Sequence, residues 1–305
     1  MNLDNDLTIL LYGPTGAGKS TLAVELAKKL WKDGKKRTAV FLADEGSRTP
    51  YNFLKEFGIA QVFMPQGNPW IWVARALQGK VKVNGKWVEV GTIVPDLGLV
   101  AHEGLTSYAE MLMQEMARMS AENINVGGEG VATLGKDKEK EEKNVLKAWK
   151  VAVKGDNEVM NVGGNSMAHY GIAQVQTRDG LLRGKPSVPH LYTAMLRRGS
   201  EEGTKAPVSG PQLVGSALTG ALPRWMDLTF RVDIEQEAHT LYIMPKPDPI
   251  MGGKTMMLAN PRIPLEGAEV RVPAFIKPAS LVGALEWLEK RGVAAREAFR
   301  MEMGV

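Results

Sequence analysis

The residues with the most specific chemistry lie near the N-terminus, where the sequence fits the pattern GxxxxGK(S/T) without a mismatch. Glycines allow consecutive backbone N–H groups to curl around phosphate oxygens without Cβ clashes. In this pattern the lysine contacts the β- and γ-phosphates of a nucleotide, and the final hydroxyl completes a Mg²⁺ shell. We therefore predict a phosphate-binding loop with ATP and Mg²⁺ as its cofactors, in which Ser20 binds the metal. The predicted binding residues are Gly13, Pro14, Thr15, Gly16, Ala17, Gly18, Lys19, Ser20 and Thr21.

The flanking segments have the patterns that such a loop requires. The apolar run Leu7–Tyr12 before the loop predicts a buried strand, and Ser20–Trp31 after it predicts a helix that ends near Gly34. The N-terminal end of that helix would add its positive end to the phosphate site. A plain glycine-rich turn is the alternative, and the fit of motif and context makes it the weaker one.

Two further strands are predicted to end in acidic residues. Thr38–Leu42 runs into Asp44 and Glu45, and Leu97–Ala101 is followed by His102 and Glu103. Alternation of strands and helices predicts an α/β fold with a mainly parallel central sheet and helices on both faces. Ligands bind at the carboxyl ends of parallel strands, so both acids are expected to face the phosphate loop.

The remaining pattern predicts further elements along the chain. Asn84-Gly85 within an alternating segment predicts a β-hairpin. Ser280 is expected to cap a C-terminal helix that starts near Leu281. The other predicted elements are strands at 61–64, 190–196, 227–234 and 240–244, helices at 107–119, 166–182 and 215–222, and a polar loop at 197–211.

The domain organisation follows from a change in composition. We predict an ATPase core over residues 1–246 and a small helical extension over residues 247–305. Within the core, the segment 121–165 is bracketed by Gly-Gly pairs and contains the lysine-rich stretch Lys136–Lys150. Such a stretch is typical of an exposed, flexible insertion.

Composition excludes several classes of site. The chain has 305 residues and no cysteine, so disulfides and thiolate metal sites are impossible. The formal net charge of +4 permits a polyanionic partner without requiring one. The N-terminus is unlike a signal peptide, and the apolar run at 7–12 is too short to span a membrane, so we expect a cytoplasmic protein.

Some aromatic and histidine side chains are interpreted as structural. Trp70 and Trp72 flank Ile71 and are expected to form a packed corner rather than a base-stacking platform. The four histidines are widely spaced and show no metal-ligand pattern, and His102 beside Glu103 is expected to be structural.

Two classes of P-loop protein are disfavoured by missing motifs. The Asn-Lys-x-Asp string of GTPases is absent, because Lys246-Pro247-Asp248 lacks the asparagine, and no LSGGQ string is present. The sequence instead resembles the RecA-like recombinase ATPases over residues 5–246. The resemblance implies that Glu45 polarises the attacking water and that Glu103, in the place of the family's Asp, supports Mg²⁺ through water. Asp96, at the entrance of the same strand, is the alternative acid.

The resemblance continues in the second half of the chain. The segment Leu191–Met195 is similar to the family's sensor strand, although Thr193-Ala194 stands where a polar amide is common. The polar loop after it is similar to a DNA-binding loop, which implies DNA contacts from Arg197, Arg198 and Lys205. Paired strands at 228–234 and 241–246 resemble those at the family's subunit interface. This implies a homo-oligomer, ring or filament, in which Lys246 or Arg224 reaches a neighbour's γ-phosphate.

Within this family the arrangement is most similar to phage-encoded ATPases of recombination and single-strand annealing. The resemblance implies a RecA-like P-loop NTPase core and a Mg²⁺-dependent ATPase that binds DNA, preferably single-stranded, in the cytoplasm of a cell or phage host. No membrane partner is expected. Two alternatives remain open: a P-loop phosphotransferase acting on a small molecule, and a slow-turnover nucleotide-gated assembly or loading factor.

Overall fold

The computed structural model describes parts of the chain that include the phosphate loop and the central sheet. The described residues are 3, 7–43, 55–64, 67–83, 86–90, 94–125, 175–178, 180–181, 188–200, 207–213, 221–223, 225–243, 246–247, 256–257 and 274–290.

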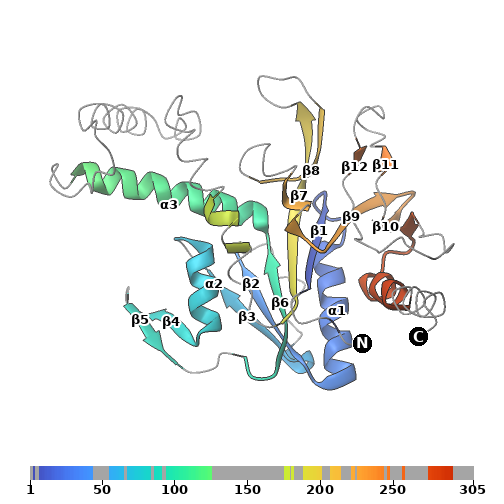
Figure 1. Ribbon diagram of the computed structural model, residues 1–305, viewed down its shortest axis with the longest axis horizontal. Coiled ribbons are helices and arrows are strands. Elements are labelled where there is room, and N and C mark those ends of the chain that lie inside the picture. Colours follow the sequence, from blue (N-terminus) through green and yellow to red (C-terminus); the bar gives the residue numbers. More distant parts are fainter. Residues whose placement is uncertain are drawn as a thin grey trace, which may run out of the picture.

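One nine-stranded sheet organises the described residues (Figure 1). Its central strands are parallel, and antiparallel pairs occur only toward the β13 edge and at β8. In sheet order the strands are β13 (Phe275–Ile276), β10 (Ala238–Tyr242), β9 (Leu228–Glu235), β1 (Thr8–Gly13), β7 (His190–Ser200), β6 (Leu97–Glu103), β2 (Arg37–Leu42) and β3 (Ile59–Phe63), with β8 (Pro207–Pro211) paired to β7.

Helices cover both faces of this sheet. On one face α1 (Lys19–Gly34) packs on a core that includes Leu11 and Ala101. On the other face α2 (Pro69–Leu77) and α3 (Leu105–Asn125) pack on a core that includes Tyr12 and Val100. Because successive side chains of a strand point to opposite faces, each central strand contributes to both cores. The predicted α/β fold with a mainly parallel sheet and helices on both faces is confirmed.

The C-terminal helix predicted from Ser280 is present at residues 281–290. The Gly283 N–H donates to Ser280 Oγ over 2.9 Å, as expected of a helix cap. Ser280 Oγ and the Leu281 N–H in turn donate to the Glu25 carboxylate of α1. The helix is thereby joined to the α1 face of the sheet, the layer that also holds the phosphate loop.

The hairpin predicted at Asn84-Gly85 is also confirmed. Strands β4 (Lys80–Val83) and β5 (Lys86–Glu89) are antiparallel, and Val83 pairs with Lys86 across the two intervening residues. Two further short strands, β11 (Lys246–Pro247) and β12 (Met256–Met257), pair with each other. The short 3-10 helix η2 (Lys55–Phe57) precedes β3.

One local prediction was wrong. The polar loop expected at 197–211 is largely a β-hairpin, because β7 continues to Ser200 and β8 returns antiparallel to it. Arg197 pairs with Gly210 and Arg198 with Ser209. Backbone hydrogen bonds do not need apolar side chains, so a polar, glycine-containing segment can form such a hairpin without the alternation that predicts strands.

Several elements differ from expectation only in length, or lie mostly outside the described residues. Helix α3 runs six residues beyond the predicted end at 119. Of the helix predicted at 166–182, residues 175–178 and 180–181 are described and are helical. Of the predicted insertion at 121–165, only 121–125 are described, as the end of α3. Across the described parts of the chain, no helix combines the length and apolarity needed to cross a membrane.

Candidate functional site

The phosphate loop joins the end of β1 to the start of α1, as predicted. Gly16 and Gly18 have φ values of 79° and 92°, which side-chain-bearing residues rarely adopt. Gly13 has a different constraint, since a Cβ there would collide with the Val232 carbonyl oxygen of β9. Three glycines of the motif are therefore required by backbone conformation or by close packing, and the loop has the geometry of a P-loop nucleotide site.

Lys19 lies at the mouth of this loop. Its Nζ donates to the Gly13 carbonyl oxygen over 3.0 Å and to the Pro14 carbonyl oxygen over 2.8 Å. Burial lowers the pKa of Lys19 below its ordinary value, and the nearby Glu103 carboxylate partly opposes that shift. A partly desolvated ammonium group interacts more strongly with an anion than a solvated one does. The position and burial of Lys19 suit an interaction with a phosphate group.

Glu103 and Ser20, the two predicted metal residues, are brought together although 83 positions separate them in sequence. Ser20 Oγ donates to Glu103 Oε2 over 3.1 Å. The same oxygen accepts from Thr193 Oγ1 of β7 over 2.9 Å, and Thr193 Oγ1 accepts from the Gly104 N–H over 3.0 Å. Glu103 is only 3% exposed. A hydroxyl and a fixed carboxylate are oxygen donors that suit Mg²⁺, directly or through water, so the residues present fit this ion.

Asp96, the alternative acid, is excluded by its position. It immediately precedes β6, whereas Glu103 is the last residue of that strand. Its side chain is exposed, and its backbone φ is 53°. Because the phosphate loop follows the carboxyl end of β1, parallel to β6 through β7, Asp96 lies at the opposite edge of the sheet.

His239 is a site residue that the sequence did not reveal. It lies on β10, and its Nδ1 is 2.9 Å from the Ala17 carbonyl oxygen of the phosphate loop. A carbonyl oxygen only accepts, so Nδ1 carries the proton and donates. The imidazole also stands beside Gly18, 3.3 Å from the position a Cβ would occupy there. A lone exposed histidine 222 positions away offers no sequence signal of this contact.

The structure describes only some of the remaining predicted site residues. Glu45, Arg224 and Lys205 lie outside the described residues. Lys246 is described in its backbone, which pairs with Met257. Arg197 and Arg198 lie on β7 within the hairpin.

The base of the hairpin is fixed next to the candidate metal site. Thr106 Oγ1, near the start of α3, accepts from the Met195 N–H over 3.1 Å and donates to the Gln212 carbonyl oxygen over 2.8 Å. Met195 is two residues after Thr193, which contacts Glu103. The hairpin that carries Arg197 and Arg198 therefore starts within a few residues of the phosphate site.

On the opposite face of the same strands lies a buried histidine–tyrosine cluster, which sequence spacing did not predict. His102 Nε2 is 2.9 Å from His190 Nδ1, and the hydroxyls of Tyr108 and Tyr192 hydrogen-bond to the two imidazoles. Burial, and then the neighbouring His190, hold the pKa of His102 well below its ordinary value. His102 is therefore a neutral hydrogen-bonding group at physiological pH. The structural interpretation of His102 stands, with a partner 88 residues away.

We expect this cluster to make stability depend on pH. The pKa of a histidine in the unfolded chain is about 6.5, whereas the pKa of His102 in the native protein is lower. As the pH falls below about 6.5, the unfolded state therefore binds more protons than the native state. As far as His102 is concerned, the free energy of unfolding is therefore highest above about pH 6.5. Below that pH it falls by up to ~1.4 kcal/mol per pH unit. Urea unfolding at pH 7 and pH 5.5 measures it. His102→Gln should flatten this dependence relative to wild type. A slope in His102→Gln equal to that of wild type would contradict the assignment.

Loss of the Glu103 carboxylate should raise the Mg²⁺ concentration that ATP binding requires. Glu103→Gln keeps the shape of the side chain but removes the charge that faces Ser20, so the Mg²⁺ concentration giving half-maximal ATP binding should rise roughly 10–100-fold. Titration of Mg²⁺ at fixed ATP measures the effect. Glu110→Gln, at an exposed glutamate of α3, is the matched control and should behave as wild type. An unchanged Mg²⁺ requirement in Glu103→Gln would show that this carboxylate does not serve the metal.

Comparisons with known proteins do not identify a function for this chain. No protein-family model and no curated protein sequence matches the chain. Among solved structures, the chain is similar to a KaiC-like protein from the hyperthermophilic archaeon Pyrococcus horikoshii, with 11% sequence identity and a TM-score of 0.35. The alignment covers 85% of this chain and 91% of that one. At this level of similarity the comparison carries no residue roles.

Proposed function

We propose that the chain is a Mg²⁺-dependent ATPase of the RecA-like type that acts on single-stranded DNA as an oligomer. The observation that carries the proposal is a set of hydrogen bonds beside the glycine-containing phosphate loop. Ser20 and Thr193 both donate to the Glu103 carboxylate there. The strand order supports it as well. β7 lies between the strand that leads into the phosphate loop and the strand that ends in Glu103. Thr193 of β7 is thereby placed to hold the carboxylate.

In the proposed reaction, water attacks the γ-phosphorus of ATP. A P–O bond to that water forms, the bond to the β–γ bridging oxygen breaks, and ADP and phosphate leave. Lys19 and the loop N–H groups hold the phosphates, while Ser20 and Glu103 would hold Mg²⁺, which neutralises phosphate charge when bound. Thr193 is a positioning residue, because it fixes the Glu103 oxygen that faces Ser20.

Glu45 is proposed to orient the attacking water and accept its proton. Leu42, three residues before it in sequence, pairs with Glu103 across β2 and β6. The chain therefore leaves β2 at the same edge of the sheet as the phosphate loop. This placement supports a role for the following acids in the reaction, as expected at the carboxyl ends of parallel strands.

Binding of single-stranded DNA is proposed for the β7–β8 hairpin. Arg197 and Arg198 lie on it, and Thr106 joins its base to the segment next to Thr193. Two arginines on one element can pair with backbone phosphates. The last part of the proposal is an oligomer in which Lys246 or Arg224 contacts the γ-phosphate of the ATP bound to a neighbouring subunit. This part rests on the resemblance of the sequence to phage recombination ATPases.

The DNA part of the proposal is tested by titrating a fluorescent single-stranded oligonucleotide with the full chain in MgATP. We expect binding that weakens steeply as salt rises, because neutralised phosphates release counterions. Arg197→Ala with Arg198→Ala should reduce the salt slope by about two. Replacement of Lys28 and Lys32, both exposed on α1, is the control. Absence of binding at low salt, or an unchanged slope in the arginine variant, contradicts the proposed interface, and a mass measurement in the same buffer tests the oligomer.

A further inference from the structure

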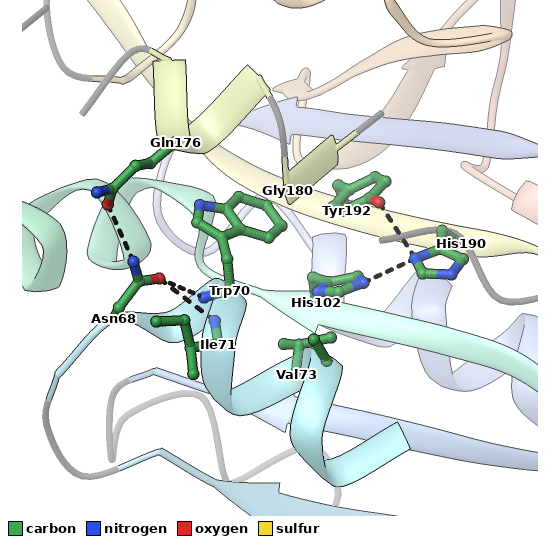
Figure 2. Close-up of a pocket in the computed structure, with 10 residues that line it drawn as sticks. Asn68, Trp70, Ile71, Val73, His102, Gln176, Gly180, His190 and Tyr192 are labelled. Carbon is green, nitrogen blue, oxygen red and sulfur yellow. Dashed lines mark hydrogen bonds between the residues drawn. The ribbon is translucent and has the colours of Figure 1, made fainter. Parts of the chain in front are cut away.

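Of the histidines in the described ranges, His239 is the one that lies next to the phosphate loop. His102 and His190 instead hydrogen-bond to each other on the face of the sheet that α2 covers (Figure 2). His239 precedes Leu241 by two residues on β10, and Leu241 packs in the core under α1. Because side chains alternate along a strand, the His239 ring lies on the α1 side as well. The reaction proposed above gives this ring no role.

The His239 ring contacts two consecutive residues of the phosphate loop. Its Nδ1 donates to the Ala17 carbonyl oxygen over 2.9 Å. Three atoms of the ring, Nδ1, Cε1 and Cγ, lie 3.3 to 3.7 Å from the position that a Cβ would take on Gly18. The ring therefore packs over Gly18 while it hydrogen-bonds to the residue before it.

This hydrogen bond fixes the direction of one peptide group of the loop. In a planar trans peptide, the C=O of one residue and the N–H of the next point in opposite directions. The Ala17 carbonyl oxygen points to His239, so the Gly18 N–H points away from His239. A phosphate loop binds through backbone N–H groups that converge on the phosphate oxygens, and the direction of this peptide group therefore matters for binding.

The glycines of the loop make that direction easy to lose. Gly16 and Gly18 have φ values of 79° and 92°, and glycine adopts positive and negative φ about as readily. The peptide group between Ala17 and Gly18 can therefore turn at little steric cost unless a partner holds it. A loop that must be ordered during binding has a lower affinity than one that is already ordered.

The backbone that carries the ring is itself held on two sides. His239 pairs with Ile234 of β9, and its carbonyl oxygen accepts from the Ala279 N–H over 2.8 Å. Ala279 directly precedes Ser280, whose Oγ donates to the Glu25 carboxylate of α1 over 2.6 Å. The ring therefore projects from a segment joined both to the sheet and, through the start of the C-terminal helix, to the helix that follows the loop.

We propose that His239 is a positioning residue of the phosphate loop: its Nδ1–H holds the Ala17–Gly18 peptide group with the Gly18 N–H directed to phosphate, which raises the affinity for MgATP. The effect on affinity rests on the proposed nucleotide function, whereas the ordering of the loop in the free chain does not. The side chain is exposed, so loss of its hydrogen bond should change loop opening and affinity by about 2–12-fold rather than abolish binding.

The ordering is tested by amide hydrogen exchange at Thr15–Gly18 in the full-length chain without nucleotide. His239→Asn keeps an N–H donor near the position of Nδ1, whereas His239→Gln moves the donor one bond further out and His239→Ala removes it. Exchange should be about 2–12-fold faster in His239→Gln and His239→Ala and unchanged in His239→Asn. The amides of β2 report on the stability of the whole sheet. If they also exchange faster in His239→Ala, the comparison of His239→Asn with His239→Gln decides.

Equal exchange at Thr15–Gly18 in wild type and all three variants overturns the proposal. Exchange in His239→Asn as fast as in His239→Gln does so too, because it shows that the hydrogen bond does not order the loop.

The effect on affinity is read from the Kd for MgATP of the same variants. We expect a Kd about 2–12-fold higher in His239→Gln and His239→Ala, and the wild-type Kd in His239→Asn. Faster exchange with an unchanged Kd overturns the role in nucleotide binding. If wild type does not bind MgATP at all, the proposed nucleotide function fails, and the exchange experiment still decides whether His239 holds the loop.

Discussion

Replacement of Lys19 by alanine is expected to raise the Kd for MgATP roughly 100-fold or more, because two charge-assisted hydrogen bonds to phosphate are lost. The expectation follows from its position, since Lys19 Nζ lies within 3.0 Å of the loop carbonyls and its pKa is lowered by burial. Because Lys19 also donates to the Gly13 and Pro14 carbonyl oxygens, a thermal unfolding curve of the variant accompanies the binding measurement. Equilibrium titration with a fluorescent ATP analogue and Mg²⁺ measures the effect.

The matched control is Lys32→Ala, which removes an exposed lysine from the last turn of the same helix. It should bind MgATP as wild type does. If Lys19→Ala binds with the wild-type Kd while the fold is retained, the loop does not hold phosphate in the proposed way.

Replacement of Glu45 by glutamine is expected to preserve binding of MgATP and to reduce kcat about 100–10,000-fold, the usual range for loss of a general base. The amide keeps the size of the side chain but accepts a proton far less readily. Single-turnover hydrolysis of labelled ATP, alongside the binding titration, separates the two effects. A variant that lost binding as well would assign Glu45 to nucleotide binding rather than to the reaction.

Glu56→Gln is the control for this experiment, because Glu56 is exposed on the 3-10 helix η2. It should hydrolyse ATP at the wild-type rate. Normal hydrolysis by Glu45→Gln would refute the RecA-type role of Glu45 and would move the search for the base to another residue.

The features that could be predicted from sequence are those encoded by neighbouring residues. The run at 7–12 is apolar because β1 is buried on both faces, and its composition alone predicts a central strand. The phosphate loop is likewise local, since its glycines, lysine and serine are consecutive. Glu103 was predicted from its place after an apolar strand, and the structure adds the contacts to Ser20 and Thr193.

The features that sequence reasoning missed depend on contacts between distant segments. His102 and His190 are 88 residues apart and meet only because β6 and β7 are adjacent, with Val100 in register with His190. His239 reaches the phosphate loop from β10, two strands away from β1. The β7–β8 hairpin is held by backbone pairing between polar residues, which leaves no hydrophobic alternation to detect.

The central claim is that the Gly13–Ser20 loop hydrolyses MgATP and that this hydrolysis is coupled to DNA. The most direct test is the rate of phosphate release by the full chain, measured with and without single-stranded DNA. We predict release that requires Mg²⁺, is lost in Lys19→Ala and rises when single-stranded DNA is added. Hydrolysis that is indifferent to DNA, with the γ-phosphate appearing on a small-molecule acceptor instead of in solution, would contradict it.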